Sequence, residues 1–258
     1  MLACSQSQSL TGRVAVVTGV SRRAGIGFAV ARRLLNLGAS VFAHSYVAHD
    51  EGQPWGVDPG GIAAVLGDLA LHGRVEHLDQ NLAEAAAPEH AIGAARTAFG
   101  HVDILVANHA RSGHGRLEDL TAEEIDAFLQ ENVRATLLLV KAFAAQHDGR
   151  TGGRVVLFTS GQHLAPMPRE IAYAVSKGAI HQATKTLSAE LITRGITVNT
   201  VNPGPTATGW AIGSPVDRMP LGRWGEPDDV ARLVAWLCLD DATWITGQVI
   251  DSEGGFTR

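Results

Sequence analysis

The sequence predicts an α/β fold, a single-domain doubly wound parallel sheet of about seven strands with helices on both faces. Three observations predict it. Short β-branched runs alternate with longer segments of helical period along the chain. Runs such as VAVV, DILVA and RVVLF are apolar throughout, which is typical of strands covered on both faces. No linker, composition shift or internal repeat divides the 258 residues, so we predict one domain.

The elements follow one another as strand and helix from the N-terminus. The run RVAVVT at 13–18 is the first strand, and residues 25–37 then carry apolar side chains at helical spacing. The same alternation recurs toward the C-terminus. The predicted strands are 13–18, 40–43, 74–78, 103–107, 154–159, 197–202 and 248–251, and the predicted helices are 25–37, 62–71, 88–99, 122–145, 172–194 and 228–239.

Composition limits the class of partner. A net charge of -5 gives no basic face for nucleic acid or an anionic membrane, and no run approaches eighteen apolar residues, so we expect a small-molecule partner. Residues 1–10 lack the features of a secretion signal and are predicted to be a flexible tail before the domain at 11–258. Two cysteines, Cys4 and Cys238, exclude a disulfide framework and a Cys-based zinc site, which suits the cytoplasm.

Glycines crowd the junction between the first strand and the first helix, in TGVSRRAGIG at 18–27. Gly19 allows a tight turn, Gly25 lets the backbone approach a phosphate, and Gly27 lets the helix lie close to the strand. The free N–H groups and the dipole of the helix N-terminus favour an anion. The turn therefore predicts a dinucleotide pyrophosphate site, and its alternative is a purely structural turn.

The end of the second strand indicates which dinucleotide binds. An acidic residue there would accept a hydrogen bond from the ribose of NAD, but residues 44–46 are His, Ser and Tyr. Arg22 and Arg23 in the glycine turn offer cations to a 2′-phosphate. We therefore predict NADPH as the preferred cofactor, with NADH possible. The alternative is that the arginines only solvate a surface loop, and the acids at 50–51 are close enough to affect this argument.

A Tyr and a Lys stand four residues apart in a chain with two tyrosines and three lysines. On a helix, Tyr173 and Lys177 share a face, so the ammonium is expected to lower the pKa of the phenol and make it a general acid or base. Ser160, at the end of a strand, can hydrogen bond to a substrate oxygen. Asn132 interrupts an apolar helical pattern, which indicates a kink or a role, although a surface Asn is the plainer reading.

Together these motifs resemble those of the short-chain dehydrogenase/reductase family, and the ending from Gly222 resembles members similar to 3-oxoacyl-acyl-carrier-protein reductases. Their order and spacing match across nearly the whole chain. The motifs are Thr18-Gly19 with Gly25-Ile26-Gly27, Asn108, Asn132, Ser160, Tyr173-x-x-x-Lys177, Asn202-Pro203-Gly204, Gly222-Arg223-Trp224-Gly225-Glu226-Pro227, Ile245-Thr246-Gly247-Gln248 and Gly254-Gly255.

The resemblance implies a Rossmann-like fold and a role for each matching residue. Tyr173 would exchange the substrate proton, Ser160 would hold the carbonyl oxygen, Lys177 would bind the nicotinamide ribose and lower the pKa of Tyr173, and Asn132 would anchor a water of the proton relay. Asp79 would contact the adenine. The predicted cofactor-binding residues are Gly19, Ser21, Arg22, Gly25, Ile26, Gly27, Asp79, Asn108, Tyr173, Lys177, Pro203, Gly204 and Thr208.

The predicted activity is interconversion of a ketone and a secondary alcohol by hydride transfer, by an NADPH-dependent ketoreductase. The alternatives are an NAD-dependent sugar, polyol or secondary-metabolite alcohol dehydrogenase and a non-catalytic dinucleotide sensor. The resemblance further implies a homotetramer formed through helices 122–145 and 172–194 and the last strand, and a substrate lid at 206–220.

Three departures from the family pattern stand out. Five residues separate Gly19 from Gly25, and His109 occupies a position where a small side chain is usual. The connection at 45–61 is long, and it either covers the adenosine or is an ordered surface insertion. Histidines follow three strand ends, at 109, 114 and 163, but no metal-binding motif accompanies them, so we predict no metal site.

Overall fold

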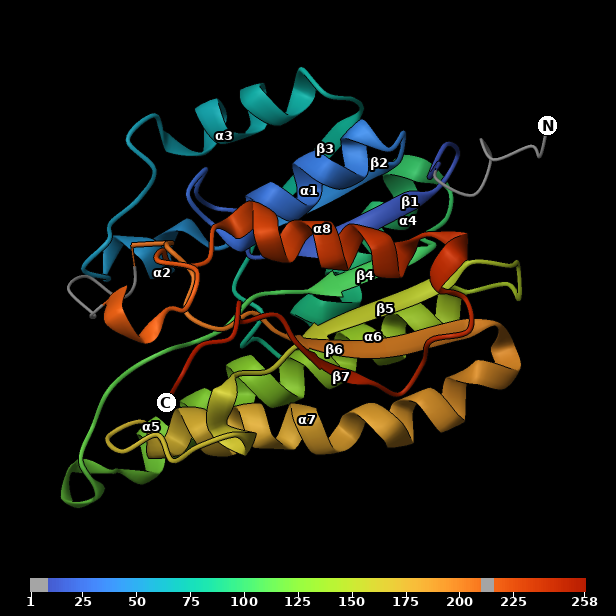
Figure 1. The fold of residues 1–258 in the computed structure, drawn as a ribbon. Helices are drawn as coiled ribbons and strands as arrows, with labels where there is room; N and C mark the ends of the chain where they lie inside the picture. Colours follow the sequence, from blue (N-terminus) through green and yellow to red (C-terminus); the bar gives the residue numbers. More distant parts are fainter. Residues whose placement is uncertain (1–8, 210–215) are drawn as a thin grey trace.

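The structure, a computed structural model, describes residues 9–209 and 216–258. Figure 1 shows one sheet between two layers of helices. Within the described residues, the strands pair in parallel in the order β3-β2-β1-β4-β5-β6-β7, which confirms the predicted doubly wound sheet. The strands are β1 Val14–Thr18, β2 Ser40–Ser45, β3 Val75–Asp79, β4 Ile104–Ala107, β5 Gly153–Phe158, β6 Ile196–Asn202 and β7 Val249–Asp251.

Apart from α2, which lies in the 45–61 connection and was not predicted, the helices begin and end close to the predicted bounds, except where noted below. The α-helices are α1 Ile26–Asn36, α2 Val47–Glu51, α3 Gly61–Ala70, α4 Ala87–Phe99, α5 Ala122–Phe128, α6 Ala135–Gln146, α7 Ile171–Leu191 and α8 Pro227–Cys238. Single 3₁₀ turns lie at Leu117–Asp119, Gly161–His163, Ile192–Arg194, Val216–Arg218 and Asp240–Ala242.

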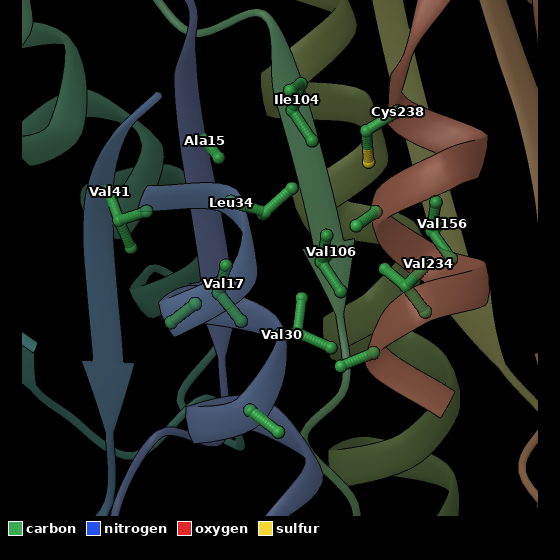
Figure 2. Packing of buried hydrophobic residues seen from close by; sticks show 14 of the residues in the cluster. Ala15, Val17, Val30, Leu34, Val41, Ile104, Val106, Val156, Val234 and Cys238 are labelled. Carbon is green, nitrogen blue, oxygen red and sulfur yellow. The ribbon is translucent and has the colours of Figure 1, made fainter. Parts of the chain in front are cut away.

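The buried strands send alternate side chains into two separate cores. Val17 packs with Val30 of α1 and Val234 of α8 on one face (Figure 2), whereas its neighbour Val16 packs with Leu139 of α6 on the other. This alternation is the period-two geometry of a strand, and it explains why both faces of β1 must be apolar. The carboxyl ends of the strands are therefore left free to build a site.

The predicted helix at 122–145 is wrong in one respect, because a π-helical turn, Leu129–Arg134, separates α5 from α6. Asn132 lies in that turn and is 1% exposed. Its side chain donates to the Arg111 carbonyl at 3.0 Å and to Ser176 Oγ at 2.8 Å, and it accepts from the Arg111 N–H at 2.7 Å. These bonds explain the break in the helix and confirm that Asn132 is not a surface residue.

Two predicted segments need further comment. The domain starts before residue 11, because Leu10 is fully buried and its N–H donates to the Leu37 carbonyl at 2.8 Å. Residues 1–8 of the predicted tail, and 210–215 of the predicted lid, lie outside the described residues. In the part of the chain that the structure describes, every helix is too short or too polar to cross a membrane.

Candidate functional site

A cavity of about 920 Å³ opens at the carboxyl ends of the strands. Most of the predicted site residues line it, although they come from segments far apart in the sequence. Gly27, Asp79 and Asn132 do not. The predicted residues that line the cavity are Gly19, Ser21, Arg22, Gly25, Ile26, Asn108, Ser160, Tyr173, Lys177, Pro203, Gly204 and Thr208.

The glycine turn between β1 and α1 leaves no room for side chains. Gly19 has a φ of +74°, and a Cβ there would lie 2.9 Å from Asn108 Nδ2. A Cβ on Gly27 would lie 2.3 Å from the Gly19 carbonyl oxygen, so α1 packs directly on the turn. Gly25 precedes α1 without a side-chain cap, which leaves N–H groups of the first turn for an anion. This cradle fits the pyrophosphate of a dinucleotide.

The two arginines of the turn are already paired with acids. Arg23 bonds to Asp58 at 2.6 Å and to Asp68 at 3.2 Å, and it does not line the cavity. The Arg23 side chain lowers the pKa of Asp58 to about 2. Arg23 is therefore engaged with these acids, and the expectation that both arginines are available to a phosphate is wrong for Arg23.

Arg22 remains at the cavity wall, although it also has partners. Its Nε lies 3.4 Å from Asp50 Oδ1, its guanidinium stacks over Trp55 with 5.3 Å to the ring centroid, and its Nη1 donates to the Thr208 carbonyl at 2.9 Å. Trp55 Nε1 donates to Asp50 at 2.7 Å. His49, Asp50 and Trp55 all line the cavity, so the long 45–61 connection forms part of its wall.

Asp79 lies at the end of β3, beside the cavity wall but not in it. Its carboxylate accepts from Ser45 Oγ at 2.5 Å and from the Val47 N–H at 3.0 Å, so it fixes the start of α2. His44 at the end of β2 does line the cavity, and burial lowers its pKa to about 4. A neutral imidazole therefore stands where an acid would select NAD.

The unusual His109 lines the cavity and bridges two elements of its wall. Its Nδ1 lies 2.8 Å from Thr18 Oγ1 and its Nε2 lies 3.1 Å from the Glu131 carbonyl. Desolvation lowers its pKa to about 3, so the ring is neutral near pH 7. The large side chain thus links β1 to the π-turn. Asn108 completes this wall, because its Nδ2 donates to the Thr18 carbonyl at 3.0 Å.

Ser160, Tyr173 and Lys177 meet at the cavity wall. Ser160 follows β5, and Tyr173 and Lys177 occupy one face of the first two turns of α7. The Tyr173 hydroxyl hydrogen bonds to Ser160, and Lys177 Nζ lies 5.8 Å from the Tyr173 ring centroid and donates to the Phe158 carbonyl at 3.2 Å. The predicted constellation is thus assembled by the fold.

The electrostatics of this trio differ from the sequence-based prediction. Burial raises the pKa of Tyr173 to about 12, against a smaller lowering effect of the Ser160 hydrogen bond. Burial lowers the pKa of Lys177 to about 8. The expected lowering of the Tyr173 pKa is wrong for this structure, because desolvation outweighs the hydrogen bond with Ser160 and the nearby Glu170 raises the pKa further. Tyr173 therefore holds its proton near neutral pH.

The segment after β7 closes the other side of the cavity, and the sequence analysis did not identify it. Glu253, Phe256 and Arg258 line the cavity together with Pro203 and Gly204. Glu253 accepts from Arg258 at 2.9 Å, and a Cβ on Gly204 would meet Glu253. The sequence could have predicted this wall, because residues that follow a parallel strand emerge at the carboxyl edge of the sheet, where the cavity lies.

The three histidines considered for a metal do not gather. His109 hydrogen bonds to Thr18 and to the Glu131 carbonyl, as described above. His163 lies 3.1 Å from Asp251 and 3.1 Å from the Ser160 carbonyl. His114 lies 3.9 Å from Glu170. A search of the described residues found no group of three or more His, Cys, Asp or Glu side chains suited to a metal. Each of these histidines instead lies beside hydrogen-bonding or acidic groups of the cavity surroundings.

Known proteins resemble this chain over almost its full length. A family model described as enoyl-(acyl carrier protein) reductase matches residues 19–257. The oxidoreductase YjdA of Bacillus subtilis (strain 168), whose function is uncharacterized, is 38% identical over 255 residues, which cover 95% of this chain and 97% of that protein.

Two solved structures share the fold. A dehydrogenase/reductase from Sinorhizobium meliloti 1021 has a TM-score of 0.86 and 33% identity, with 96% of each chain covered. A short chain dehydrogenase from Burkholderia cenocepacia J2315, solved in complex with NADP, has a TM-score of 0.84 and 34% identity over 95% of this chain and 98% of that one. Both likenesses extend across the cavity described above.

Proposed function

Because the chain belongs to the short-chain dehydrogenase/reductase family and is an NAD(P)-dependent oxidoreductase, we propose that it is an NADPH-dependent ketoreductase. The observation that carries the proposal is the meeting of Ser160, Tyr173 and Lys177 on the wall of a cavity that also contains the glycine turn. A dinucleotide sensor needs only the turn, so the polar trio favours an enzyme.

The proposed reaction converts a ketone, NADPH and a proton into a secondary alcohol and NADP⁺. When bound, NADPH would supply the hydride that the carbonyl carbon accepts. Ser160 holds the carbonyl oxygen, and Tyr173 donates its proton to that oxygen. The raised pKa of Tyr173 keeps the proton in place until negative charge develops on the substrate. Lys177 then stabilises the phenolate and binds the nicotinamide ribose.

The preference for NADPH is supported by three observations. The end of β2 carries no acid, Arg22 lines the cavity, and the Burkholderia cenocepacia protein was solved with NADP. Arg22 supplies a cation for the 2′-phosphate, in competition with Asp50. Pro203, Gly204 and Thr208 line the cavity and would hold the nicotinamide end. Ser21, Gly25 and Ile26 would hold the phosphates.

Other roles in the proposal follow from position. Asn132 is a positioning residue, since its side chain holds the Arg111 backbone and Ser176 beside the site. The water relay at Asn132, the adenine contact of Asp79 and the lid at 206–220 stay predictions. We also propose that the protein is cytoplasmic and forms a homotetramer. Assembly is supported by exposed apolar side chains on the helices expected to form the interface, at Ile125, Leu137 and Val175.

The first test measures binding of NADPH and NADH to the purified protein, followed by turnover of a panel of ketones that includes a 3-oxoacyl thioester. Tighter binding of NADPH and reduction of ketones are expected. Tyr173→Phe should then retain NADPH binding and lose turnover by roughly 10²–10⁴-fold, as expected on removal of a general acid.

The result also separates the alternatives. Preference for NADH with oxidation of sugars or polyols would replace the proposal with an alcohol dehydrogenase. Binding of NADPH without turnover of any ketone or alcohol would indicate a sensor. Undiminished turnover by Tyr173→Phe would overturn the proposed proton donor.

A further inference from the structure

Glu170 is a buried acid at the edge of the catalytic trio. It immediately precedes α7, three residues before Tyr173, and its side chain is 15% exposed. It lines both the large cavity and a small hollow beside Tyr173. Its Oε2 is buried and has no hydrogen-bond partner among the described residues. Such an acceptor is costly unless a ligand supplies a donor.

The other acids that line the cavity have close cationic partners. Asp50 pairs with Arg22, Glu131 with Arg111 at 3.0 Å, and Glu253 with Arg258. Glu170 differs, because no Lys or Arg pairs with it among the described residues, and the imidazole Nδ1 of the 61% exposed His114 lies 3.9 Å from Oε1. Burial raises the pKa of Glu170. Its hydrogen-bonding capacity therefore remains largely unused by the protein.

The backbone holds Glu170 in place at some cost. The preceding residue, Arg169, has a φ of +71°, a left-handed conformation that is unfavourable for a residue with a Cβ. The Arg169 carbonyl accepts from the Gly115 N–H at 2.7 Å, and Gly115 forms a β-bridge with Glu170. Two loops are thus fastened together at the point where the carboxylate faces the cavity.

Water in the small hollow does not satisfy the carboxylate. That hollow, lined by Gly113, Phe128 and Tyr173 among others, has no space for a water molecule. The terminal torsion of a Glu side chain is soft, so the carboxylate can turn either oxygen toward the large cavity. A donor that reaches Glu170 therefore comes from the large cavity, where a substrate hydroxyl can take the place of water.

We propose that Glu170 is a substrate-specificity residue, whose carboxylate accepts a hydrogen bond from a hydroxyl group one or two carbons from the reacting carbonyl. Glu170 and Tyr173 line the same cavity and lie close enough to interact electrostatically, so a carbonyl at Tyr173 brings such a hydroxyl toward Glu170. The inference rests on the proposed ketoreductase function and adds a substrate class, the hydroxy ketones. A buried acceptor also rejects analogues that lack the donor.

The test compares matched ketones that differ only in the donor. We would measure kcat/KM with NADPH for 2-hydroxyacetophenone against 2-methoxyacetophenone, and for 3-hydroxypropiophenone against its methyl ether. The wild-type protein is expected to prefer the hydroxyl compound in at least one pair by about tenfold or more, since the methoxy compound leaves a buried acceptor without a donor. Glu170→Leu should reduce that ratio to about one, and Glu170→Gln should give an intermediate ratio.

Glu190→Gln is the matched control, because Glu190 is exposed at the far end of the same helix. It should keep the wild-type ratio, and NADPH affinity and thermal unfolding should be unchanged in Glu170→Gln. Equal turnover of hydroxyl and methoxy compounds by the wild-type protein in both pairs, or a preference that survives Glu170→Leu, would overturn the inference while leaving the ketoreductase proposal intact. Failure to reduce any ketone would overturn both.

Discussion

The two ends of the cavity differ in how their ionisable groups are held. At the glycine-turn end, Arg22 and Arg23 are matched by acids of the 45–61 segment and its continuation into α3. At the reaction end, Tyr173 and Lys177 are buried with their pKa values shifted toward the neutral forms. Partly exposed ion pairs contribute little to stability and exchange readily for a ligand. Buried groups with strongly shifted pKa values are typical of catalytic sites. The contrast separates a binding end from a reacting end.

The largest expected effect comes from a steric clash introduced into the glycine turn at the binding end. Gly27→Ala places a Cβ about where the Gly19 carbonyl already lies, 2.3 Å away, so α1 and the turn must separate. We expect a stability loss of about 1–3 kcal/mol and loss of most NADPH affinity. Chemical denaturation and NADPH titration measure both.

Gly67→Ala provides the control for that experiment. Gly67 lies on the exposed side of α3, and a Cβ there meets nothing within 4 Å. It should increase stability by about 0.5–1 kcal/mol, because Ala is the better helix former. Wild-type NADPH affinity in Gly27→Ala would show that the close approach of α1 is not required.

The next effect concerns the reaction end and its pH dependence. In the folded protein Lys177 loses its proton near pH 8, so the charged form that stabilises the phenolate is lost as pH rises above that value. The kcat/KM for ketone reduction should fall above about pH 8. Lys177→Arg should be slower but should show no such fall, because Arg stays charged. Parallel pH profiles for the two proteins would assign the fall to another group.

A smaller effect tests the ion pairs of the binding end. Arg22→Ala should weaken NADPH binding by about tenfold, the loss of one charge-assisted contact, and leave NADH binding nearly unchanged. Asp50→Asn should do the opposite, since it releases Arg22 from its acid. Fluorescence titration of both cofactors gives the four ratios. Equal weakening of NADPH and NADH by Arg22→Ala would mean that Arg22 does not contact the 2′-phosphate.

The last effect is on stability at acid pH and concerns His109 in the cavity wall. His109 has a folded pKa of about 3, whereas the unfolded chain binds a proton below about pH 6.5. The unfolded state therefore holds more protons between these values, and stability falls as pH falls through that window. His109→Gln should reduce the stability loss between pH 7 and pH 5 by about 1–2 kcal/mol. Identical pH dependence in urea denaturation would contradict this.

The sequence predicted the sheet and the catalytic trio because both depend on local patterns. Apolar runs reveal buried parallel strands, and the Tyr173 to Lys177 spacing reveals a shared helix face. The pairing of Arg22 with Asp50 was harder to predict from the sequence, because it depends on how the 45–61 segment folds back onto the glycine turn. The raised pKa of Tyr173 was also out of reach, because it arises from burial by several distant segments.

Glu170 and His109 illustrate two kinds of omission. Glu170 carried a signal, an acid next to the helix that bears Tyr173, but its unsatisfied oxygen is a property of packing. In the sequence, His109 stands out as too large for its position and as one of three histidines that follow strand ends, but its bridging role is not evident. The structure shows that its two nitrogens replace a small side chain with a bridge from Thr18 to the Glu131 carbonyl.

The strand order also governs how the cavity comes into being during folding. β1 pairs with β4, although β2 and β3 lie between them in the chain. The entropy of closing this long loop is therefore lost before the contacts between the two strands can stabilise the pairing. The glycine turn follows β1 and the catalytic trio follows β5, on opposite sides of that seam. Neither half alone contains a complete site, so the dinucleotide should bind the finished fold and slow its unfolding by mass action.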